Sequence, residues 1–389
     1  MTNAILVLNA GSSSIKFALY EAERLDVLCR GQIDSIGGAA RFTVRGRKAE
    51  LLPKTPALPQ PATHETLTAW LLDTLRAIGD VTIAAAGHRV VHGGAQFNAP
   101  VRLDDAVMGE LDRLVSLAPL HEPHNLATIR AVAKTWSQLP QVACFDTQFH
   151  RTQPRLAQLF ALPRELTDDG VLRYGFHGLS YEYIASVLPE HAGGRADGRV
   201  IVAHLGNGAS MCALKERRSI ASTMGFTALD GLMMGTRTGA LDPGVVLHLL
   251  QQKGMSAGEV SDLLYNRSGL LGVSGISADV RRLEATDDPR AAEALDLFAY
   301  RVARELGALV AVLGGLDVLV FTAGIGEHSA GMRRRICEQA AWAGVVVDPA
   351  ANTKGGPKIS SPKSQVEVLV IPTDEEVVIA RSTQQLVTT

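Results

Sequence analysis

Two short segments of this chain have matching sequences, ILVLNAGSSSIKFAL from Ile5 and IVAHLGNGASMCAL from Ile201. In each segment an apolar strand ends at a polar residue, Asn9 or His204, and a turn of small residues leads into a second apolar strand. Gly11 aligns with Gly206, an offset of 195 residues in a chain of 389. Because this offset is close to half the chain, the simplest organisation is a pair of related domains.

Both turns have the composition of a hairpin that binds phosphate. Small residues let backbone N–H groups approach an anion closely, and hydroxyl, amide and ammonium groups add donors. The candidate donors are Ser12, Ser14, Lys16 and Asn207. Turns of glycine and serine are often ordinary hairpin turns, but their occurrence at matched positions favours phosphate binding. We therefore expect the paired domains to share one nucleotide.

Composition points to a globular protein that binds small molecules. The chain is 46% hydrophobic, which is enough for substantial cores in a pair of domains. A net charge of −2 and a pI near 6.6 give no electrostatic basis for binding nucleic acid or an anionic membrane. Cys29, Cys144, Cys212 and Cys337 form no CxxC pair, so we expect buried free thiols in a reducing cytoplasm.

Two apolar stretches of the chain, the N-terminal one and the one from Leu306 to Val320, are predicted not to be a signal peptide or a membrane span. The N-terminal stretch is interrupted at Asn9, which indicates a strand rather than a signal peptide. The stretch from Leu306 to Val320 is divided by Gly314, Gly315 and Asp317 into a helix end and a strand, both shorter than the ~20 residues a span requires.

Hydrophobic periodicity predicts alternating strands and helices in both halves. Strands are expected at the two hairpins, near 27–33, 41–44, 82–86, 141–145, 318–322 and 366–371. Helices are expected near 65–78, 104–115 (with Asp104 as N-cap), 125–136, 243–252, 257–265, 291–313, after GIGEHS and after PTDEE. This alternation predicts an α/β protein with a largely parallel or mixed sheet, covered on both faces, in each domain.

Arginines and histidines in glycine- or proline-rich segments are the main candidates for chemistry. Arg89 in GHRVVHGG and Arg237 in GLMMGTRTG are poorly placed for packing and well placed to bind carboxylate or phosphoryl oxygens. Ordinary salt bridges are the alternative for either arginine alone. His121 in APLHEPHN and His177 in YGFHG could donate to a developing negative charge.

The other candidates are weaker when each is taken singly. His92, His124 and His150 are expected to be exposed loop residues. Asp146, at a strand end, and Glu375 and Glu376, at a helix start, could serve a hard cation such as magnesium, although acidic residues also favour helix N-termini. GVSGISADVRR and FTAGIGEHS are glycine-rich joints, the second a strand–loop–helix step. A Walker A loop is absent, as is a GxGxxG after a strand, so the hairpins must supply the phosphate cradle.

The sequence as a whole resembles the acetate kinase family. The resemblance rests on NAGSSSIK, GHRVVHGG, LAPLH, FDTQFH, RYGFHG, HLGNGAS, GLMMGTRTG, GVSGIS, TAGIGE and PTDEE, in the family's order. It implies duplicated domains of the actin and sugar-kinase type, ribonuclease H-like, around a nucleotide cleft. It also implies residues 1–148 as an acyl-side domain, completed by a C-terminal helix 376–389, and residues 149–375 as a nucleotide-side domain. A cytoplasmic homodimer that uses Mg²⁺, with Mn²⁺ as the alternative ion, and ATP or ADP as co-substrate is implied as well.

The resemblance assigns roles to individual residues. It places magnesium at Asn9 and Glu375; ATP phosphates at Lys16 and at His204, Leu205, Gly206, Asn207 and Gly208; and adenosine at Asp279, Val280, Arg281, Gly324, Ile325, Gly326, Glu327 and His328. It places the acetate carboxylate at Arg89, with Val91, Leu120 and His121 nearby, and the transferring phosphoryl group at His177 and Arg237. Asp146 is the family's catalytic acid, and because acetate is already an anion at pH 7 we interpret it as a holder of magnesium or its waters.

The activity that these roles imply is reversible in-line transfer of the ATP γ-phosphoryl group to acetate, giving acetyl phosphate and ADP. Positive groups would lower the repulsion between the reacting anions. Ala228 stands where the family commonly has proline, which leaves propionate as an alternative acceptor. His328 stands where the family has asparagine, which leaves the preferred nucleotide open, whereas Asp230 in place of glutamate is conservative. A different class of protein, a silent nucleotide-binding module of the actin type, is the other alternative.

Overall fold

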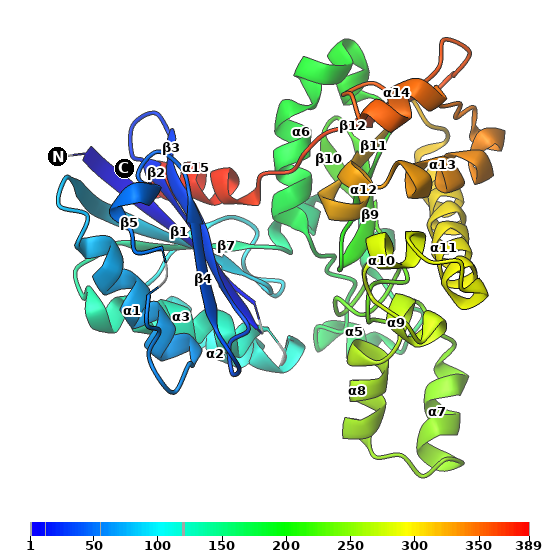
Figure 1. The fold of residues 1–389 in the computed structure, drawn as a ribbon. Helices are drawn as coiled ribbons and strands as arrows, with labels where there is room; N and C mark the ends of the chain where they lie inside the picture. The colour runs from blue at the N-terminus through cyan, green and yellow to red at the C-terminus, as the bar shows by residue number, and fades with distance from the viewer. Residues whose placement is uncertain (1, 12, 55, 119–120, 389) are drawn as a thin grey trace. The chain divides into compact units, whose positions relative to one another are not determined.

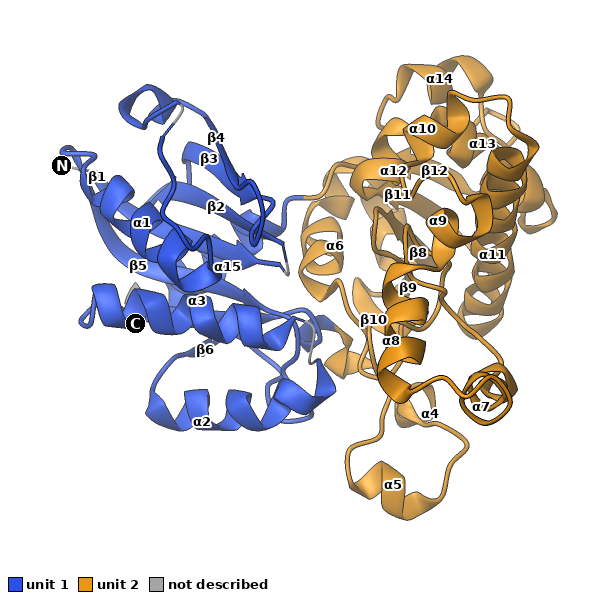
Figure 2. Cartoon of the chain, turned by 60° about the horizontal axis from the view of Figure 1, so that its bottom comes forward, with its two compact units in different colours: residues 1–149, 374–389 blue, residues 150–373 orange. Residues whose placement is uncertain are grey.

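The computed structural model of the protein describes residues 2–11, 13–54, 56–118 and 121–388. The chain forms two compact units (Figure 2): unit 1 comprises Met1–Phe149 with Asp374–Thr389, and unit 2 comprises His150–Thr373. The C-terminal segment is part of unit 1.

Unit 1 is built on a seven-stranded mixed sheet in the order β4-β3-β2-β1-β5-β7-β6 (Figure 1). Its strands are β1 (Thr2–Ala10), β2 (Ser14–Glu21), β3 (Val27–Asp34), β4 (Arg41–Arg45), β5 (Val81–Val90), β6 (Val101–Arg102) and β7 (Gln141–Phe145). β1 pairs antiparallel with β2 and parallel with β5, which in turn pairs parallel with β7. The carboxyl ends of β1, β5 and β7 therefore lie at one edge of the sheet.

Helices cover both faces of this sheet. They are α1 (His64–Arg76), α2 (Asp105–Leu114), α3 (Glu122–Thr135) and α15 (Glu375–Thr388), with short 3-10 turns at Ala49–Leu51, Val115–Leu117 and Gln148–Thr152. Leu6 and Leu8 of β1 pack with Leu71 of α1 and Val132 of α3 in one core. On β5 a Cβ at Gly87 would lie 2.6 Å from Ile379 of α15, so that helix packs close against the opposite face. The consecutive buried apolar residues from Ala4 to Leu8 of β1 thus contribute to both faces of the sheet.

The helix starts in unit 1 follow local capping chemistry. Asp104 is the N-cap of α2, as predicted, and its Oδ1 accepts a hydrogen bond from the Val107 N–H at 2.8 Å. Thr63 and Thr66 form a capping box at the start of α1.

Unit 2 repeats the central topology of unit 1 with a five-stranded sheet in the order β10-β9-β8-β11-β12. Its strands are β8 (Val200–Leu205), β9 (Ala209–Lys215), β10 (Arg218–Ser222), β11 (Val318–Thr322) and β12 (Glu367–Val370). β8 pairs antiparallel with β9 and parallel with β11, just as β1 pairs with β2 and β5. The predicted duplication, and with it the predicted fold class, is confirmed.

Unit 2 contains the following helices in addition to this sheet. They are α4 (Arg155–Gln158), α5 (Arg164–Asp168), α6 (Gly178–Ala192), α7 (Pro243–Gln251), α8 (Ala257–Asn266), α9 (Gly269–Ser274), α10 (Val280–Glu284), α11 (Pro289–Leu313), α12 (Ala323–His328), α13 (Ala330–Gln339) and α14 (Pro349–Lys354), with 3-10 turns at Gly193–Asp197 and Ala341–Ala343. Both ribbon views place α6 and α11 on opposite sides of the sheet (Figures 1 and 2).

The cysteines and the apolar helices can be compared with the predictions. All four cysteines are buried and free, as expected. Within the described residues, every helix is too short or too polar to cross a membrane.

Candidate active site

The first hairpin brings an amide and an ammonium group to the carboxyl end of β1. Asn9 lies opposite Lys16 in the β1–β2 ladder, and the Gly11 N–H closes the turn by donating to the Ser14 carbonyl at 2.8 Å. Lys16 is exposed, and Asn9 and Ser14 are partly exposed. Ser12, also predicted to bind phosphate, lies outside the described residues.

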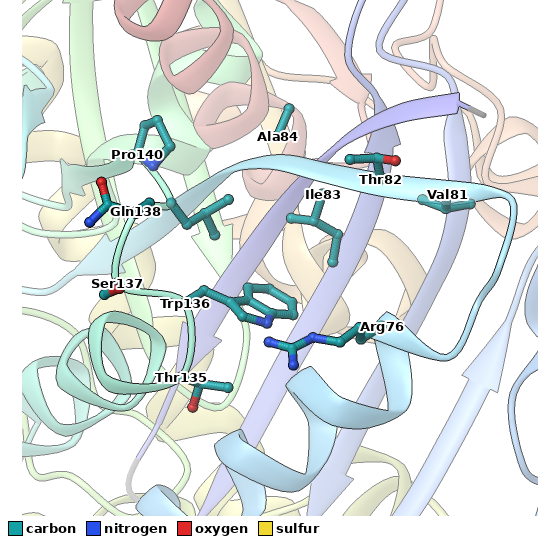
Figure 3. Close-up of a pocket in the computed structure, with 11 residues that line it drawn as sticks. Arg76, Val81, Thr82, Ile83, Ala84, Thr135, Trp136, Ser137, Gln138 and Pro140 are labelled. Atoms are coloured by element: carbon teal, nitrogen blue, oxygen red, sulfur yellow. The ribbon is translucent and has the colours of Figure 1, made fainter.

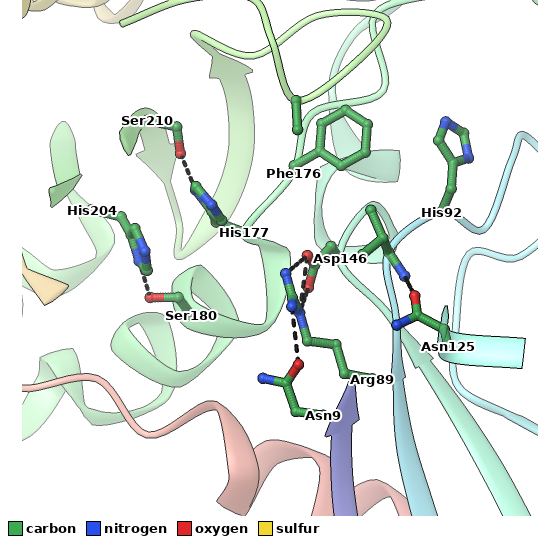
Figure 4. Close-up of polar contacts among 12 residues, drawn as sticks. Asn9, Arg89, His92, Asn125, Asp146, Phe176, His177, Ser180, His204 and Ser210 are labelled. Atoms are coloured by element: carbon green, nitrogen blue, oxygen red, sulfur yellow. Dashed lines mark hydrogen bonds and ion pairs between the residues drawn. The ribbon is translucent and has the colours of Figure 1, made fainter. Parts of the chain in front are cut away.

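Arg89, near the carboxyl end of β5, is held between Asp146 and Asn9 (Figure 4). Its Nε donates to Asp146 Oδ1 at 3.0 Å, its Nη1 donates to Asn9 Oδ1 at 3.1 Å, and its Nη2 donates to Asp146 Oδ2. Burial disfavours the charge of Arg89, but the ion pair with Asp146 outweighs burial and raises the arginine pKa. The contacts of the described residues occupy three of the five guanidinium N–H groups, so the remaining N–H groups can bind an anion.

Glu375 begins α15 in the same unit and has a perturbed carboxyl group. Burial is the main cause that raises its pKa to about 7, and the negative charge of Asp146 adds to the effect. A bound cation would restore the ionised form. In the described parts of the chain no group of three or more His, Cys, Asp or Glu residues could hold a metal ion. Asn9 and Glu375, the predicted magnesium ligands, both interact with Arg89: Asn9 Oδ1 accepts from Arg89 Nη1, and the charge of Arg89 acts on the Glu375 carboxyl group.

The segment after β5 carries Val91, which is predicted to lie near the methyl group of acetate. Buried polar side chains form hydrogen bonds to the backbone of this segment. Val91 is buried, and its N–H donates to Asn125 Oδ1 at 3.0 Å. The expectation that His92 is exposed is wrong, because the residue is fully buried. Its polar groups are satisfied there: its N–H donates to Glu122 Oε2, and its Nδ1 accepts from the Gly94 N–H at 2.9 Å.

The start of helix α3 lies beside this segment, because Glu122 and Asn125 accept hydrogen bonds from its backbone. His121 is its N-cap residue and is half-buried. Leu120, predicted to shape the acyl pocket, lies outside the described residues. Glu122 and Asn125 were not singled out from the sequence, and single polar residues on a helix gave no signal that could have identified them.

Glu122 leads to a prediction about stability. It is fully buried and one carboxyl oxygen, Oε1, has no hydrogen-bond partner among the described residues. Burial raises its pKa from 4.5 to about 8, so the folded state binds the proton more tightly than the unfolded chain does. The stabilisation is complete below the unfolded pKa and is lost as the pH rises through the folded pKa.

The Glu122→Gln variant should therefore lose less stability than the wild type between about pH 5 and pH 9. The difference could reach a few kcal/mol, since one unit of pKa corresponds to about 1.4 kcal/mol. Urea unfolding of both proteins across this range would test it. Parallel stability curves would show that the carboxyl group has no raised pKa.

In unit 2, His177 and His204 form a stacked pair with ring centroids 4.3 Å apart. The Nδ1 of His177 bonds to Ser210 Oγ and that of His204 bonds to Ser180 Oγ, each at 2.8 Å (Figure 4). His177 has a left-handed φ of 58° and is the N-cap residue of α6, so the predicted loop position is also the start of a helix.

Arg237 lies beside this pair of histidines. A Cβ atom built on Gly208 would lie 3.3 Å from His177 Nε2 and 3.7 Å from Arg237 Nη1, so these groups converge on the second hairpin turn. The turn is closed by the Gly206 N–H, which donates to the Gly208 carbonyl at 3.1 Å, and Leu205 is the buried last residue of β8. Arg237 Nη1 also donates to the carbonyl of Ala228 at 3.0 Å.

A cavity of about 470 Å³ adjoins this turn in unit 2. It is lined by Gly206, Asn207, Ala278, Asp279, Val280, Arg281, Glu284, Gly324, Ile325, His328 and Ser329. Most residues predicted to contact adenosine are thus brought together, along with three that were not predicted: Ala278, Glu284 and Ser329. Ala278 belongs to GVSGISADVRR, one of the glycine-rich segments that the sequence indicates as a candidate. Glu284 and Ser329 have no such signal, because the 2.7 Å hydrogen bond between them joins residues that are distant in the sequence.

Gly326 and Glu327 do not line this cavity. The expected strand–loop–helix step is wrong here, because residues 323–328 form the short helix α12 directly after β11. Glu327 Oε1 accepts from the Ala323 N–H at 2.8 Å and from the Thr373 N–H at 3.2 Å, which stabilises that helix start.

His150 corrects a further expectation, since it was predicted to be exposed and only 1% of its surface is accessible. Its ring bonds to Ser219 Oγ and to the Phe176 carbonyl, each at 2.9 Å, and burial lowers its pKa to about 4. A Cβ on Gly175 would lie 2.6 Å from this ring, so His150 supports the turn before His177. His124 is half-buried and stacks on His64 rather than standing free in solvent.

Another cavity, of about 680 Å³, lies at the opposite end of β5 from Arg89 (Figure 3). It is lined by residues 81–84 at the start of β5 and by residues 135–140, and Arg76 lies over the ring of Trp136 there. Ligand sites of α/β sheets lie at the carboxyl ends of strands, so this cavity does not belong to the candidate site.

Known proteins are similar to this chain along nearly its whole length. An acetate kinase of Rhodopseudomonas palustris (strain ATCC BAA-98 / CGA009) is 57% identical over 394 residues, covering 99% of both chains. A solved propionate kinase of Francisella tularensis has a TM-score of 0.92 at 35% identity, covering 99% of this chain and 100% of that one. A solved Porphyromonas gingivalis acetate kinase has a TM-score of 0.85 at 37% identity, covering 99% of both. The sequence model described as the acetokinase family matches residues 4–381, and the chain therefore belongs to that family.

Proposed function

We propose that this protein is an acetate kinase, which transfers the γ-phosphoryl group of ATP to acetate reversibly and forms acetyl phosphate and ADP by in-line displacement. Membership of the acetokinase family supports phosphotransfer to a carboxylate. The observation that carries the proposal is Arg89, a partly buried guanidinium that is paired with Asp146 and has N–H groups left to bind a carboxylate. Such a paired, oriented arginine suits a small carboxylate.

The residues divide the work according to their chemistry. Arg89 would hold and orient the acetate carboxylate, with Val91 against the methyl group. Lys16 and the backbone of the hairpin turns would bind phosphate oxygens, and His177 and Arg237 would stabilise charge on the transferring phosphoryl group. Together these groups would reduce the repulsion between two anions.

Magnesium is part of this proposal. Asn9 and Glu375 would hold the ion, with Asp146 binding it or its waters while also orienting Arg89. When bound, the ion would neutralise charge on the ATP phosphates. The raised pKa of Glu375 supports a cation at this position.

The cavity in unit 2 is proposed as the adenosine site. Its volume of about 470 Å³ suits a nucleoside, and it adjoins the phosphate-binding turn at Gly206 and Asn207. His328 lines it, so this residue can affect which nucleotide is preferred.

The test of the function is ADP formation by purified protein with ATP and magnesium, with acetate, propionate or butyrate as acceptor and hydroxylamine to trap acyl phosphate. Acetate-dependent ADP with stoichiometric hydroxamate is expected. A higher kcat/KM for propionate would instead favour propionate kinase, the second candidate, which the structural similarity to a propionate kinase supports. No turnover with any acid would refute the proposal.

The assembly and location of the protein are also proposals. We expect a homodimer, because α7 buries none of its residues and exposes apolar ones, with Leu247 52% accessible. Light scattering of the purified protein would give its mass. Four free thiols are typical of a reducing compartment, which favours the cytoplasm and can be checked by cell fractionation.

A further inference from the structure

The irregular segment after β5 owes its conformation to side chains rather than to a strand partner. Four successive backbone N–H groups, those of residues 91–94, donate to the side chains of Asn125, Glu122, Thr147 and His92 in turn. Asn125 and Glu122 both come from the first turns of α3. The position of this segment therefore depends on α3.

Asn125 differs from the other three because it also binds the phosphate hairpin. Its Oδ1 accepts from the Val91 N–H at 3.0 Å, and its Nδ2 donates to the Ala10 carbonyl at 2.7 Å. The side chain is 2% exposed, so both bonds are shielded from water. Only one orientation of the amide satisfies both contacts, because one partner is a donor and the other an acceptor.

The partners of Asn125 are adjacent to residues of the candidate site. Ala10 follows Asn9, the proposed magnesium ligand, and Val91 lies two residues after Arg89. Arg89 Nη1 donates to Asn9 Oδ1 at 3.1 Å, so the two segments meet at their side chains as well as through the buried amide (Figure 4). The Asn125 amide thus sets the spacing between the segment that carries Arg89 and Val91 and the β1–β2 hairpin that carries Asn9.

We propose that Asn125 is a positioning residue for phosphotransfer, which holds the Arg89–Val91 segment in register with the Asn9–Lys16 hairpin. The inference rests on the proposed function, because it assigns acetate to the first segment and phosphate to the second. Asn125 is not a catalytic residue, since it contacts only backbone atoms of these segments. Misplacement of reacting groups by about 1 Å can lower a rate by about 10²-fold.

Two variants separate the hydrogen bonds of Asn125. Asn125→Ala removes both. Asn125→Asp keeps the acceptor for the Val91 N–H and, at a pH where its carboxyl group is ionised, presents an oxygen without a proton to the Ala10 carbonyl. Thr128→Val is the matched control, because Thr128 lies one turn further along α3, is 1% exposed, and donates only to the His124 carbonyl within its own helix.

Steady-state kinetics with acetate and ATP, run well below the melting temperature of each variant, would test the proposal. Asn125→Ala should raise KM for acetate and lower kcat, with a loss of about 10²-fold in kcat/KM. Asn125→Asp should lower kcat while KM for acetate stays within about threefold of the wild type, because the Val91 contact remains. Thr128→Val should leave both constants within about twofold of the wild type.

Wild-type constants in both Asn125 variants, or equal losses in Thr128→Val and Asn125→Ala, would overturn the inference. If Asn125→Ala does not fold, Asn125→Asp decides alone, and an unchanged kcat would overturn the proposal. A wild-type protein without turnover would refute the proposed function instead, so the two failures can be told apart.

Discussion

Replacement of Arg89 by alanine is expected to lower kcat/KM for acetate by about 10³-fold or more. The variant removes the proposed partner of the acceptor carboxylate. It also leaves Asp146, whose side chain is only 2% exposed, without the ion pair that neutralises it. Arg89→Lys should recover little activity, because an ammonium cannot reproduce contacts to Asp146 and Asn9 while also binding an acid.

Arg76→Ala is the matched control for Arg89→Ala. Arg76 belongs to the same unit but lies by the cavity at the opposite end of β5, over the ring of Trp136 (Figure 3). Its removal should change kcat/KM by less than about twofold at a temperature where the protein is folded. Hydroxamate formation across a range of acetate concentrations gives all these values. An Arg89→Ala enzyme with near wild-type efficiency would show that another group binds the acceptor.

Replacement of Arg237 by alanine is expected to abolish most turnover while ATP binding is retained. Arg237 Nη1 lies near the second hairpin turn beside His177, where it is proposed to stabilise charge that develops only during transfer. A group of this kind affects kcat far more than substrate binding, and we expect a loss of about 10³-fold in kcat. The proposed adenosine contacts lie in a separate set of residues, so affinity for ADP should change by less than about threefold.

This experiment also separates an enzyme from a silent nucleotide-binding module. A module would show no wild-type turnover and the same nucleotide affinity in both proteins. Calorimetric titration with ADP, together with the hydroxamate assay, supplies both measurements. Arg217→Ala is a suitable control, because Arg217 forms an exposed ion pair with Asp197, and such pairs contribute little. Equal losses in both variants would contradict the assignment of Arg237.

The duplicated fold could be predicted because its signal repeats locally. The hairpin pattern occurs at both ends of the 195-residue offset, and the helix cap at Asp104 lies directly beside the helix that it starts. Strand pairs, turns and caps of this kind depend on residues close in sequence. The sequence therefore indicates the two hairpins and a parallel or mixed sheet in each domain, whereas the order of the strands comes from the structure.

The interior of the site could not be predicted in the same way. His92 and His150 look like loop histidines in the sequence, but their partners Glu122 and Ser219 come from elements 30 and 69 residues away. The α12 helix follows β11 without a loop. Glu327 Oε1 stabilises its start by accepting hydrogen bonds from the Ala323 N–H and from the N–H of Thr373, which lies 46 residues further along the chain. None of these distant partners is visible in a local pattern.

Sequence alone determined the repeated hairpins, the alternation of strands and helices, and the set of charged groups available for binding anions. Tertiary structure alone decided which of those groups are buried and paired: Arg89 with Asp146, and Asn125 between the Ala10 carbonyl and the Val91 N–H. The physical reason is that a propensity is local, whereas burial and hydrogen-bond pairing depend on segments far apart in the chain, such as Ala10 and Asn125, which are 115 residues apart and are brought together by packing of the sheet.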